Sequence, residues 1–562
     1  MEQLKTELLQ SLNTGFIDRT IHSKNEFLPQ LLVNNKFQGK KVLTSILKEL
    51  KELKEGDEFW FSVAFITTSG VATLMNSLIE LEKKNIQGKI LVSQYLNFTQ
   101  PEALKMLLKF KNIELKIVVD GDFHSKGYLF KRGNLYNLII GSSNLTAIAL
   151  CSNKEWNLKI SATPLSQIIF DSVNEFTSEF EKAVKVDSTF IGKYQEVYNK
   201  NIEFNKNIRE NLVSSKKIVP NSMQIEALNN IDLLRAEGKT KALLISATGT
   251  GKTFLSAFDV KKFNPKKFLF IVHRETITKA AMETFKTIFG DSKSMGFYTG
   301  NEKDLSADFI FSTVQTISKQ EYLNQFDKNY FDYIVIDETH RAGAASYQRI
   351  LEYFNPKFLL GMTATPERGD NFDIFKSFDY NIAYEIRLHK ALDENMLSPF
   401  HYFGVTDITV DGELLEENSS FKLLTSDERV NRIIEKATLF GCDNGIIRGL
   451  VFCSSVDECI ALSNEFNNRG YKTVALTGGN SEEERANAIN RIESNEPTEK
   501  LDYIFTRDIF NEGIDIPSVN QIIMLRPTQS AIVFVQQLGR GLRKNGNKEY
   551  LTVKIGRASC RE

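Results

Sequence analysis

The chain has 562 residues, 42% hydrophobic and 25% charged, which is typical of globular proteins and leaves room for three or four domains. Its net charge of −1 excludes a globally basic surface, so any nucleic acid must be bound in local grooves. No apolar run approaches the ~18 residues of a membrane span, and the five cysteines lack metal-ligand spacing. We therefore expect a cytoplasmic protein without a membrane partner.

Residues 1–190 alternate strand and helix patterns, which predicts an α/β domain. Strands are expected at residues 59–66, 89–92, 115–119 and 138–140, and helices at residues 44–54 and 71–84. The polar stretch at residues 191–215 is rich in Asn, Lys and Glu, and we interpret it as a helical linker.

One group of polar residues in this domain suits phosphodiester chemistry. His124 and Lys126 alternate along an expected strand, so their side chains should lie on one face. A histidine nucleophile beside a lysine that holds the phosphate is a workable arrangement for such a reaction. The Gly-Ser-Ser-Asn segment at residues 141–144 and then Glu155 follow, and their polar groups could complete the cradle.

This pattern, His-x-Lys followed by Gly-Ser-x-Asn, resembles the phospholipase-D-like fold, in which it forms half of an active site. The resemblance implies that His124 is the nucleophile or the partner acid. It also implies that Lys126 and Asn144 bind phosphate and that Ser142 supports them. Glu155 stands where the restriction-nuclease-like branch places a carboxylate that orients the histidine.

The sequence departs from the lipases of that family. Lys131 occupies the place where many of them carry an acidic residue, which counts against a lipase but not against a nuclease. A second half-site is absent from the sequence, because His22-Ser23-Lys24 has no following Gly-Ser-x-Asn. A single half-site suggests that two chains form a homodimer through this domain to complete the site. The alternative is a degenerate domain that only binds nucleic acid or only dimerises.

A phosphate-binding motif, SATGTGKT at residues 246–253, lies between a strand expected at residues 242–245 and a helix expected at residues 254–260. Strand, glycine-rich turn and helix form the context in which this motif binds phosphate. Lys252 would reach the β- and γ-phosphates, and the Thr253 hydroxyl would hold Mg²⁺. The phosphate oxygens would be surrounded by backbone N–H groups of the turn, at Thr248, Gly249, Thr250 and Gly251.

Two carboxylates follow a second apolar run at residues 331–336. Asp337 can bind Mg²⁺ through water, and Glu338 can orient the water that attacks ATP. Farther along, Arg540 and Arg543 are three residues apart, so a helix would present both to one side. Forked guanidinium groups suit a transferring phosphoryl group, and these parts together indicate ATP hydrolysis.

The ordered motifs over residues 215–553 resemble superfamily 2 helicases and translocases of the DExH type. Besides SATGTGKT, the set includes DETH at residues 337–340, TAT at residues 363–365, VFCS at residues 451–454 and QQLGRGLR at residues 536–543. The resemblance implies two RecA-like parallel-sheet domains, at residues 216–395 and 396–553, with ATP and Mg²⁺ between them.

Site residues of that family carry over onto matching positions. Gln224 looks like the glutamine that reads adenine, and Arg540 and Arg543 would act as arginine fingers across the cleft. Further nucleotide contacts are implied at Gly513, Asp515 and Gln537. A single strand would touch motifs that contain His273, Arg274, Thr313, Gln315, Thr477, Gly478 and Thr506. Contacts to a nucleic-acid backbone imply little sequence specificity.

The leading interpretation is an ATP-driven nucleic-acid helicase or translocase fused to a metal-independent nuclease. DNA is favoured over RNA as the partner, but the motifs do not distinguish the two. The arrangement is similar to a group of bacterial helicases, which also occur among restriction and phage-defence systems. Three alternatives stay open: a motor whose N-terminal domain only binds DNA or dimerises, a scaffold that uses ATP as a switch, and a phospholipase. The intact Glu338, Arg540 and Arg543 argue against the switch.

Three further segments carry expectations. A basic run is either a nucleic-acid groove or a solvated face, and it comprises Lys261, Lys262, Lys266, Lys267, His273 and Arg274. Residues 407–426 have few helix signals and predict an excursion near the inter-domain connection. Residues 554–562 do not continue the strand expected at residues 550–553, and they match one reading frame of a common sequencing adapter. We therefore expect a non-native tail and a longer natural protein.

Overall fold

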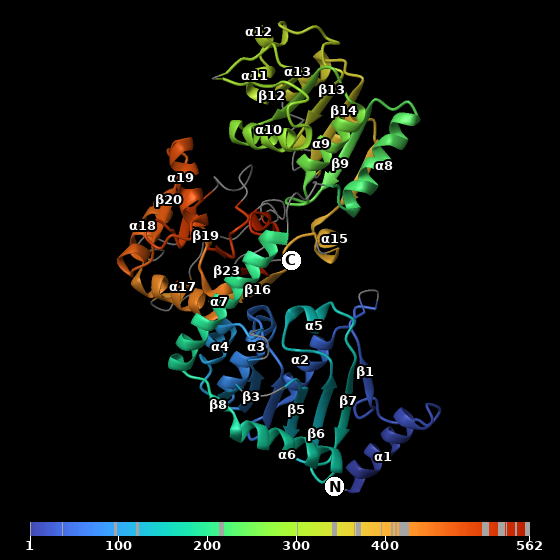
Figure 1. Cartoon of the computed structure of the whole chain (residues 1–562), viewed down its shortest axis with the longest axis vertical. Coiled ribbons are helices and arrows are strands. Elements are labelled where there is room, and N and C mark those ends of the chain that lie inside the picture. The colour runs from blue at the N-terminus through green and yellow to red at the C-terminus, as the bar shows by residue number, and fades with distance from the viewer. Residues whose placement is uncertain are drawn as a thin grey trace. The chain divides into compact units, whose positions relative to one another are not determined.

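In the computed structural model the chain forms two compact units, one of residues 1–214 with 435–446 and one of residues 215–434 with 447–562 (Figure 1). Both units combine strands and helices, as expected for the α/β class. The structure describes residues 2–35, 38–94, 98–119, 123–212, 219–300, 302–339, 345–364, 366, 373–394, 396–405, 409–410, 413–414, 426–507, 516–525, 534, 537–545 and 548–556.

An eight-stranded mixed sheet organises the first unit, in the order β1-β7-β6-β5-β2-β3-β4-β8. β2, β3 and β4 are parallel, whereas β5, β6 and β7 form an antiparallel meander joined to β2. The strands are β1 (Gln30–Leu32), β2 (Glu58–Val63), β3 (Gln87–Ser93), β4 (Ile113–Val118), β5 (Lys126–Arg132), β6 (Leu135–Gly141), β7 (Asn157–Ala162) and β8 (Val184–Lys185). The helices are α1 (Glu2–Phe16), α2 (Val42–Glu52), α3 (Thr68–Lys83), α4 (Pro101–Leu107), α5 (Ala147–Cys151), α6 (Gln167–Lys182) and α7 (Ser188–Leu212).

Apolar side chains cover both faces of this sheet, because neighbouring residues on a strand point to opposite sides. In β2, Phe59 and Phe61 are fully buried on one side, and Trp60 packs on the other in a cluster with Leu91 and residues of α6. Trp60 stacks on Phe176 of α6 with ring centroids 4.8 Å apart. Aromatic stacking therefore fixes α6 over the strand ends that carry the polar half-site.

A buried ion pair ties α2 to the sheet. Glu49 of α2 is 1% exposed and lies 2.5 Å from the ammonium of Lys159 on β7. The same carboxylate accepts a hydrogen bond from the side-chain amide of Asn137 on β6. Because removing one partner of a buried pair leaves an uncompensated charge, the pair specifies how α2 docks on the sheet.

Two parallel sheets organise the second unit, with seven strands in the order β11-β12-β10-β13-β14-β9-β15 and six in the order β16-β23-β22-β19-β21-β20. The seven-stranded sheet contains β9 (Lys241–Ser246), β10 (Phe268–Val272), β11 (Met295–Tyr298), β12 (Phe309–Thr313), β13 (Tyr333–Ile336), β14 (Phe358–Thr363) and β15 (Ile382–Ile386). The six-stranded sheet contains β16 (Phe400–Val405), β19 (Gly449–Phe452), β20 (Thr473–Leu476), β21 (Tyr503–Thr506), β22 (Gln521–Met524) and β23 (Leu551–Gly556). These are the two RecA-like sheets expected from the motif order.

Helices connect consecutive strands in this unit. Those of the seven-stranded part are α8 (Ser222–Ala236), α9 (Lys252–Phe263), α10 (Glu275–Phe289), α11 (Val314–Ile317), α12 (Gln320–Leu323), α13 (Ala345–Tyr353), α14 (Ile374–Ser377) and α15 (Leu388–Asp393). Those that follow are α17 (Asp427–Phe440), α18 (Val456–Asn468) and α19 (Glu482–Glu493). In an open parallel sheet the carboxyl ends of the strands share one edge, and that edge is where ligands bind.

Two local expectations can be compared with the strands. β23 continues to Gly556, beyond the expected end at Val553, because its backbone pairs with β16 up to Val405. Ladder hydrogen bonds use backbone groups, so strand pairing does not require an apolar sequence. The excursion expected at residues 407–426 includes a two-stranded hairpin, β17 (Thr409–Val410) with β18 (Glu413–Leu414).

Among the described residues, no helix combines the length and the apolar character needed to cross a membrane.

His401 on β16 is a buried histidine, from which we expect an acid sensitivity of the second RecA-like sheet. Burial lowers the pKa of His401 to about 4, and its imidazole packs edge-on against Tyr550 with ring centroids 4.7 Å apart. The neutral ring is thus favoured in the fold, so its stabilisation is complete above the unfolded pKa of roughly 6.5 and is lost as the pH falls toward 4. At pH 5 we expect a cost of about 1 to 2 kcal/mol in the free energy of unfolding.

Melting curves at pH 7.5 and pH 5 test this expectation. His401→Phe should lose less stability between the two pH values than the wild type. The same change at the exposed His389 should leave the acid loss unchanged. An identical acid loss in His401→Phe and wild type would contradict the assignment.

Candidate nucleotide and phosphodiester sites

The phosphate loop follows β9 directly. Gly249 and Gly251 both have φ near +87°, a left-handed backbone that turns successive N–H groups to one side. The Thr250 hydroxyl donates to the carbonyl of Ala247 at 2.7 Å and lies 2.6 Å from the Ser246 hydroxyl. Gly251 is the N-cap of α9. The turn is therefore already shaped as an anion cradle at a helix N-terminus.

Lys252 is folded back on this loop. Its ammonium donates to the carbonyl oxygens of Ser246 at 2.9 Å and Ala247 at 3.3 Å. Burial lowers the pKa of Lys252 below its usual value. The nearby carboxylates of Asp337 and Glu338 partly offset that shift, and the guanidiniums of Arg540 and Arg543 add to it. Every charged group of the expected ATPase chemistry thus acts on one ammonium.

Gln224 touches the same loop. Its side chain completes a capping box at the start of α8, because its Oε1 accepts from the backbone N–H of Asn221 at 2.9 Å. Its Nε2 donates to the carbonyl of Gly251 at 3.1 Å. A cavity of about 480 Å³ borders Gln224 and the glycines, and its walls combine apolar Phe254 and Met396 with charged Glu394 and Lys544. A cavity of this size could hold a purine base.

Asp337 and Glu338 follow β13, at the edge that carries the phosphate loop. Glu338 has φ +56°, the left-handed region that non-glycine residues rarely adopt, and such strain clusters at functional sites. Its backbone N–H donates to the Asp337 carboxylate at 2.9 Å, and the Thr339 hydroxyl donates to the carbonyl of Met362 on β14 at 3.0 Å. His340 lies outside the described residues.

The residues near the phosphate loop could hold Mg²⁺ only together with the phosphate oxygens of a bound nucleotide. Among the described residues, no group of three His, Cys, Asp or Glu side chains is arranged to hold a metal ion. Magnesium in ATP sites keeps waters and phosphate oxygens as ligands and takes few from protein. Thr253 on the first turn of α9 and Asp337 after β13 are placed for that role, without a dedicated cage.

The two arginines do not share a helix face, contrary to expectation. The helix that contains Gln537 ends at Gly539, and residues 540–543 form a turn that leaves Arg540 5% exposed and Arg543 on the surface. Glycines on both sides of Arg540 disfavour a continued helix. A Cβ atom at Gly539 would lie 3.1 Å from Cβ of Thr248, so the turn packs against the phosphate loop. Gly513 and Asp515 lie outside the described residues.

The expected strand-contacting residues lie after carboxyl ends of β10, β12, β20 and β21. His273 and Thr313 are nearly buried, and Thr506 is fully buried, so their side chains are poorly available to a ligand. Those that reach solvent are Arg274, Gln315, Thr477 and Gly478. Thr477 is held by Asn480, whose Oδ1 accepts from its backbone N–H at 2.7 Å.

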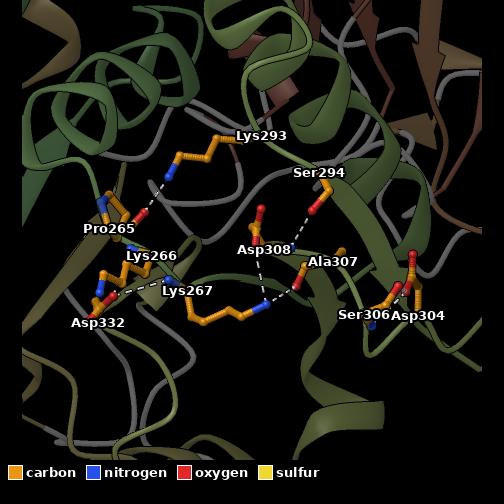
Figure 2. Close-up of polar contacts among 10 residues, drawn as sticks. All are labelled: Pro265, Lys266, Lys267, Lys293, Ser294, Asp304, Ser306, Ala307, Asp308 and Asp332. Atoms are coloured by element: carbon orange, nitrogen blue, oxygen red, sulfur yellow. Dashed lines mark hydrogen bonds and ion pairs between the residues drawn. The ribbon is translucent and has the colours of Figure 1, made fainter.

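Three lysines of the basic run, Lys261, Lys262 and Lys267, are engaged by nearby acceptors, and Figure 2 shows the contacts of Lys267. The ammonium of Lys267 lies 3.2 Å from both the Asp308 carboxylate and the carbonyl of Ala307. Lys262 pairs with Asp232, and Lys261 donates to the carbonyl of Ile288 at 2.6 Å. These lysines precede β10, at the end of the sheet opposite to the phosphate loop. The geometry therefore favours the solvated face over a nucleic-acid groove for this part of the run.

In the first unit, His124 precedes β5 and does not lie on it, contrary to expectation. β2 ends at Val63, which pairs with Lys126, so no ladder partner extends to His124. The two side chains still meet, because the Lys126 ammonium lies 2.8 Å from Nδ1 of His124. Burial lowers the pKa of Lys126, and Glu155 opposes that shift.

The downstream polar residues are engaged by other groups. The Ser142 hydroxyl donates to the Glu155 carboxylate. The Oδ1 atom of Asn144 accepts from the backbone N–H groups of Ala64 at 3.1 Å and Phe65 at 3.3 Å, so Asn144 caps the end of β2. Only the amide NH₂ of Asn144 is left to face a phosphate.

A cavity of about 730 Å³ opens beside His124 and Lys126. Its floor is apolar, with Leu91, Leu129 and Leu138 from the sheet. One wall is acidic, because α6 contributes Asp171, Glu175 and Glu179. The sequence analysis did not single out these carboxylates, although their spacing of four residues places them on one helix face.

Family models match three segments of the chain. "Cardiolipin synthase, PLD-like domain" matches residues 46–184, "Type III restriction enzyme, res subunit" residues 217–368, and "Helicase conserved C-terminal domain" residues 431–545.

Sequence relatives match the helicase part. IRC3 of Saccharomyces cerevisiae, named as a candidate ATP-dependent helicase, is 28% identical over 55% of this chain and 48% of its own length. The EcoAI type I restriction enzyme endonuclease subunit of Escherichia coli is 25% identical over 58% of this chain and 44% of its own. The chain thus spans less than half the length of these relatives.

A solved structure of the ATP-dependent type ISP restriction-modification enzyme LlaBIII bound to DNA aligns with a TM-score of 0.48 at 18% identity, over 62% of this chain and 28% of that one. The family models identify the helicase part with an ATP-hydrolysing enzyme class. The chain therefore carries the two helicase domains of superfamily 2 and, ahead of them, a phospholipase-D-like domain.

Proposed function

We propose that this chain is an ATP-driven motor on nucleic acid whose N-terminal domain cleaves phosphodiester bonds without a metal ion. The observation that carries the motor is the buried ammonium of Lys252. Two carboxylates, Asp337 and Glu338, and two guanidiniums, Arg540 and Arg543, all influence its pKa. Phosphoryl transfer requires a phosphate-binding loop with carboxylate and guanidinium groups around one ammonium. The glycine turn and these four side chains supply those parts.

ATP would bind by exchanging contacts that the loop now makes with itself. The β- and γ-phosphates would accept the N–H groups of the glycine turn and the Lys252 ammonium, which gives up the carbonyls of Ser246 and Ala247. Glu338 would orient the attacking water, and Arg540 would stabilise charge on the transferring group. Mg²⁺, beside Thr253 and Asp337, would neutralise phosphate charge when bound.

The nucleic-acid track would run past the exposed residues at the strand ends. These residues offer one cation, one amide, one hydroxyl and peptide groups, from Arg274, Gln315, Thr477 and Gly478. Such groups suit contacts to the sugar-phosphate backbone and provide little discrimination between bases. We assign DNA rather than RNA because the relatives include a restriction-enzyme subunit. Both translocation and unwinding are compatible with these residues.

The phosphodiesterase would use His124 as nucleophile or partner acid and Lys126 to hold the phosphate. Their contact of 2.8 Å supports the proposal, because both groups can reach one phosphate. Since the sequence has a single His-x-Lys with a downstream Gly-Ser-x-Asn, a second copy of the chain would supply the other half-site.

A second candidate function is a DNA-binding or dimerisation module without catalysis. Two observations favour it. Glu155 is bonded to Ser142, and Oδ1 of Asn144 is used to cap β2. The carboxylates of α6 along the cavity would repel a polyanion that ran along that wall, which favours the dimerisation role over DNA binding at this cavity. A cleaved strand would therefore have to approach from the His124 side.

Gly251→Ala tests the anion cradle. A Cβ atom at Gly251 would lie 2.9 Å from Nε2 of Gln224, and an L-residue is strained at its φ of +87°. We expect at least about a tenfold loss of affinity for a non-hydrolysable ATP analogue by calorimetry. Gly238→Ala is the matched control, because Gly238 has φ +78° but open space around its Cβ position. Equal analogue affinity in both variants would contradict the cradle.

Glu338→Gln tests the proposed water-orienting role. The amide keeps the size of the side chain but removes its charge, so ATP binding should persist while the ATPase kcat falls by about 100-fold or more. The measurement is steady-state hydrolysis with and without single-stranded DNA, beside analogue binding. A kcat near the wild-type value would exclude Glu338 from the chemistry.

His124→Ala tests the phosphodiesterase. Cleavage of single- and double-stranded DNA should survive EDTA in the wild type, whereas ATPase should stop, because only the ATPase uses Mg²⁺. His124→Ala should abolish the EDTA-resistant cleavage and leave DNA-stimulated ATPase intact. His22→Ala is the matched control, because His22-Ser23-Lys24 repeats the local sequence outside the site. No EDTA-resistant cleavage by the wild type would favour the binding module.

A further inference from the structure

Lys548 is a buried cation in the second RecA-like sheet region. Its side chain is 9% exposed, and its ammonium donates to three carbonyl oxygens, those of Pro517 at 2.6 Å, Gly541 at 2.7 Å and Val519 at 3.1 Å. An ammonium has three protons, and each can be donated to one of these three carbonyl oxygens. The three acceptors come from two separate segments of the chain, which Lys548 therefore joins.

One of those segments is the turn at residues 540–543, here called the arginine turn. Each of its last three carbonyls has a donor. Gly541 accepts from Lys548, Leu542 from the backbone N–H of Ser398 at 2.7 Å, and Arg543 from the hydroxyl of Ser398 at 3.3 Å. The backbone of the arginine turn is thus held at consecutive peptide groups.

The space around the turn leaves it little freedom. A Cβ atom at Gly541 would lie 2.7 Å from a methyl carbon of Leu551 on β23, so the backbone is in close contact with the sheet. The other segment held by Lys548 contains Pro517 and Val519 and leads into β22. Lys548 is therefore placed to fix the arginine turn relative to the segment that enters β22.

We propose that Lys548 is a positioning residue for ATP hydrolysis, because its tripod of hydrogen bonds holds the arginine turn in the orientation that Arg540 needs. The proposal rests on the proposed role of Arg540. Lys548 itself donates to backbone oxygens. Its effect on ATP hydrolysis would be exerted through the guanidinium of Arg540. Loss of the tripod would let the turn shift by small distances, which lowers turnover more than nucleotide binding, since oriented donors matter most in the transition state.

The variants are Lys548→Met, which removes the charge, and Lys548→Arg, which keeps it. A planar guanidinium cannot reproduce a tripod, so the arginine variant should fold and still be impaired. The matched control is Lys472→Met. Lys472 is an exposed lysine of the same sheet region, and its ammonium also donates to a proline carbonyl, that of Pro497.

Steady-state ATPase in the presence of DNA gives kcat and KM for the full chain, with melting temperature measured beside them. We expect kcat to fall by about tenfold in Lys548→Met and severalfold in Lys548→Arg, with KM for ATP nearly unchanged. Lys472→Met should match the wild type. A normal kcat in a folded Lys548→Arg and Lys548→Met would overturn the proposal.

A double-mutant cycle with Arg540→Ala separates positioning from a general loss of structure. If Lys548 acts through Arg540, adding Lys548→Met to Arg540→Ala should lower kcat no further. Equal factors in the two backgrounds would overturn the proposal and assign Lys548 a purely structural role. If Arg540→Ala keeps a normal kcat, the result contradicts the proposed arginine-finger role of Arg540. That outcome is distinguishable from a failure of the Lys548 proposal alone.

Discussion

The motor part of the structure depends on one desolvated cation. The Lys252 ammonium is held by two carbonyls of its own loop, while carboxylates from one sheet and guanidiniums from the other act on it. A buried ammonium is costly to desolvate, and the loop carbonyls compensate that cost only in part. Under the proposed function, a polyphosphate would add negative charge beside the ammonium.

The placement of the groups around that cation follows from parallel strands. The phosphate loop, the two carboxylates and the Thr363 segment each come directly after a strand, and the strands β9, β13 and β14 are neighbours. Because parallel strands all end at one edge, motifs far apart in the chain meet there without long loops. Strain is then confined to a few residues, such as Glu338 with its left-handed backbone. The Asp337 carboxylate accepts a hydrogen bond from the Glu338 backbone N–H, and the Thr339 hydroxyl bonds to Met362 on β14, so both neighbours hold that conformation.

The sequence predicted the strands and the motif order well, because both depend on local patterns. Continuous apolar runs such as β10 are buried on both faces, and the glycine turn between strand and helix allows few other conformations. Side-chain direction was predicted less well. The arginine pair was expected on a helix, but two glycines end the helix at Gly539. His124 was expected on a strand, but the partner strand ends two residues too early for it.

Features that depend on what lies opposite in space could not be decided from the sequence. For the basic run the sequence left a nucleic-acid groove and a solvated face open, and Asp232 and Asp308, both distant in the chain, pair with two of its lysines. For Asn144 the sequence predicted a phosphate contact, and in the structure its carbonyl oxygen caps the end of β2. A polar side chain meets its nearest unsatisfied partner, and backbone N–H groups at strand ends are always candidates.

In the phospholipase-D-like half-site of the first unit, a single chain brings only part of the polar side chains into position for a phosphate. His124 and Lys126 meet, but Ser142 and Glu155 satisfy each other and Asn144 faces the backbone, so the polar groups are not yet directed at one point. Bringing them to a phosphate requires that the ligand, or a second copy, compete with those internal bonds. Such competition is favourable only when several charged groups act on the phosphate at once. Under the proposed function, a site built from two identical halves would meet that condition, because a second His-Lys pair would bring further polar and charged groups to the same phosphate without adding a residue to the chain.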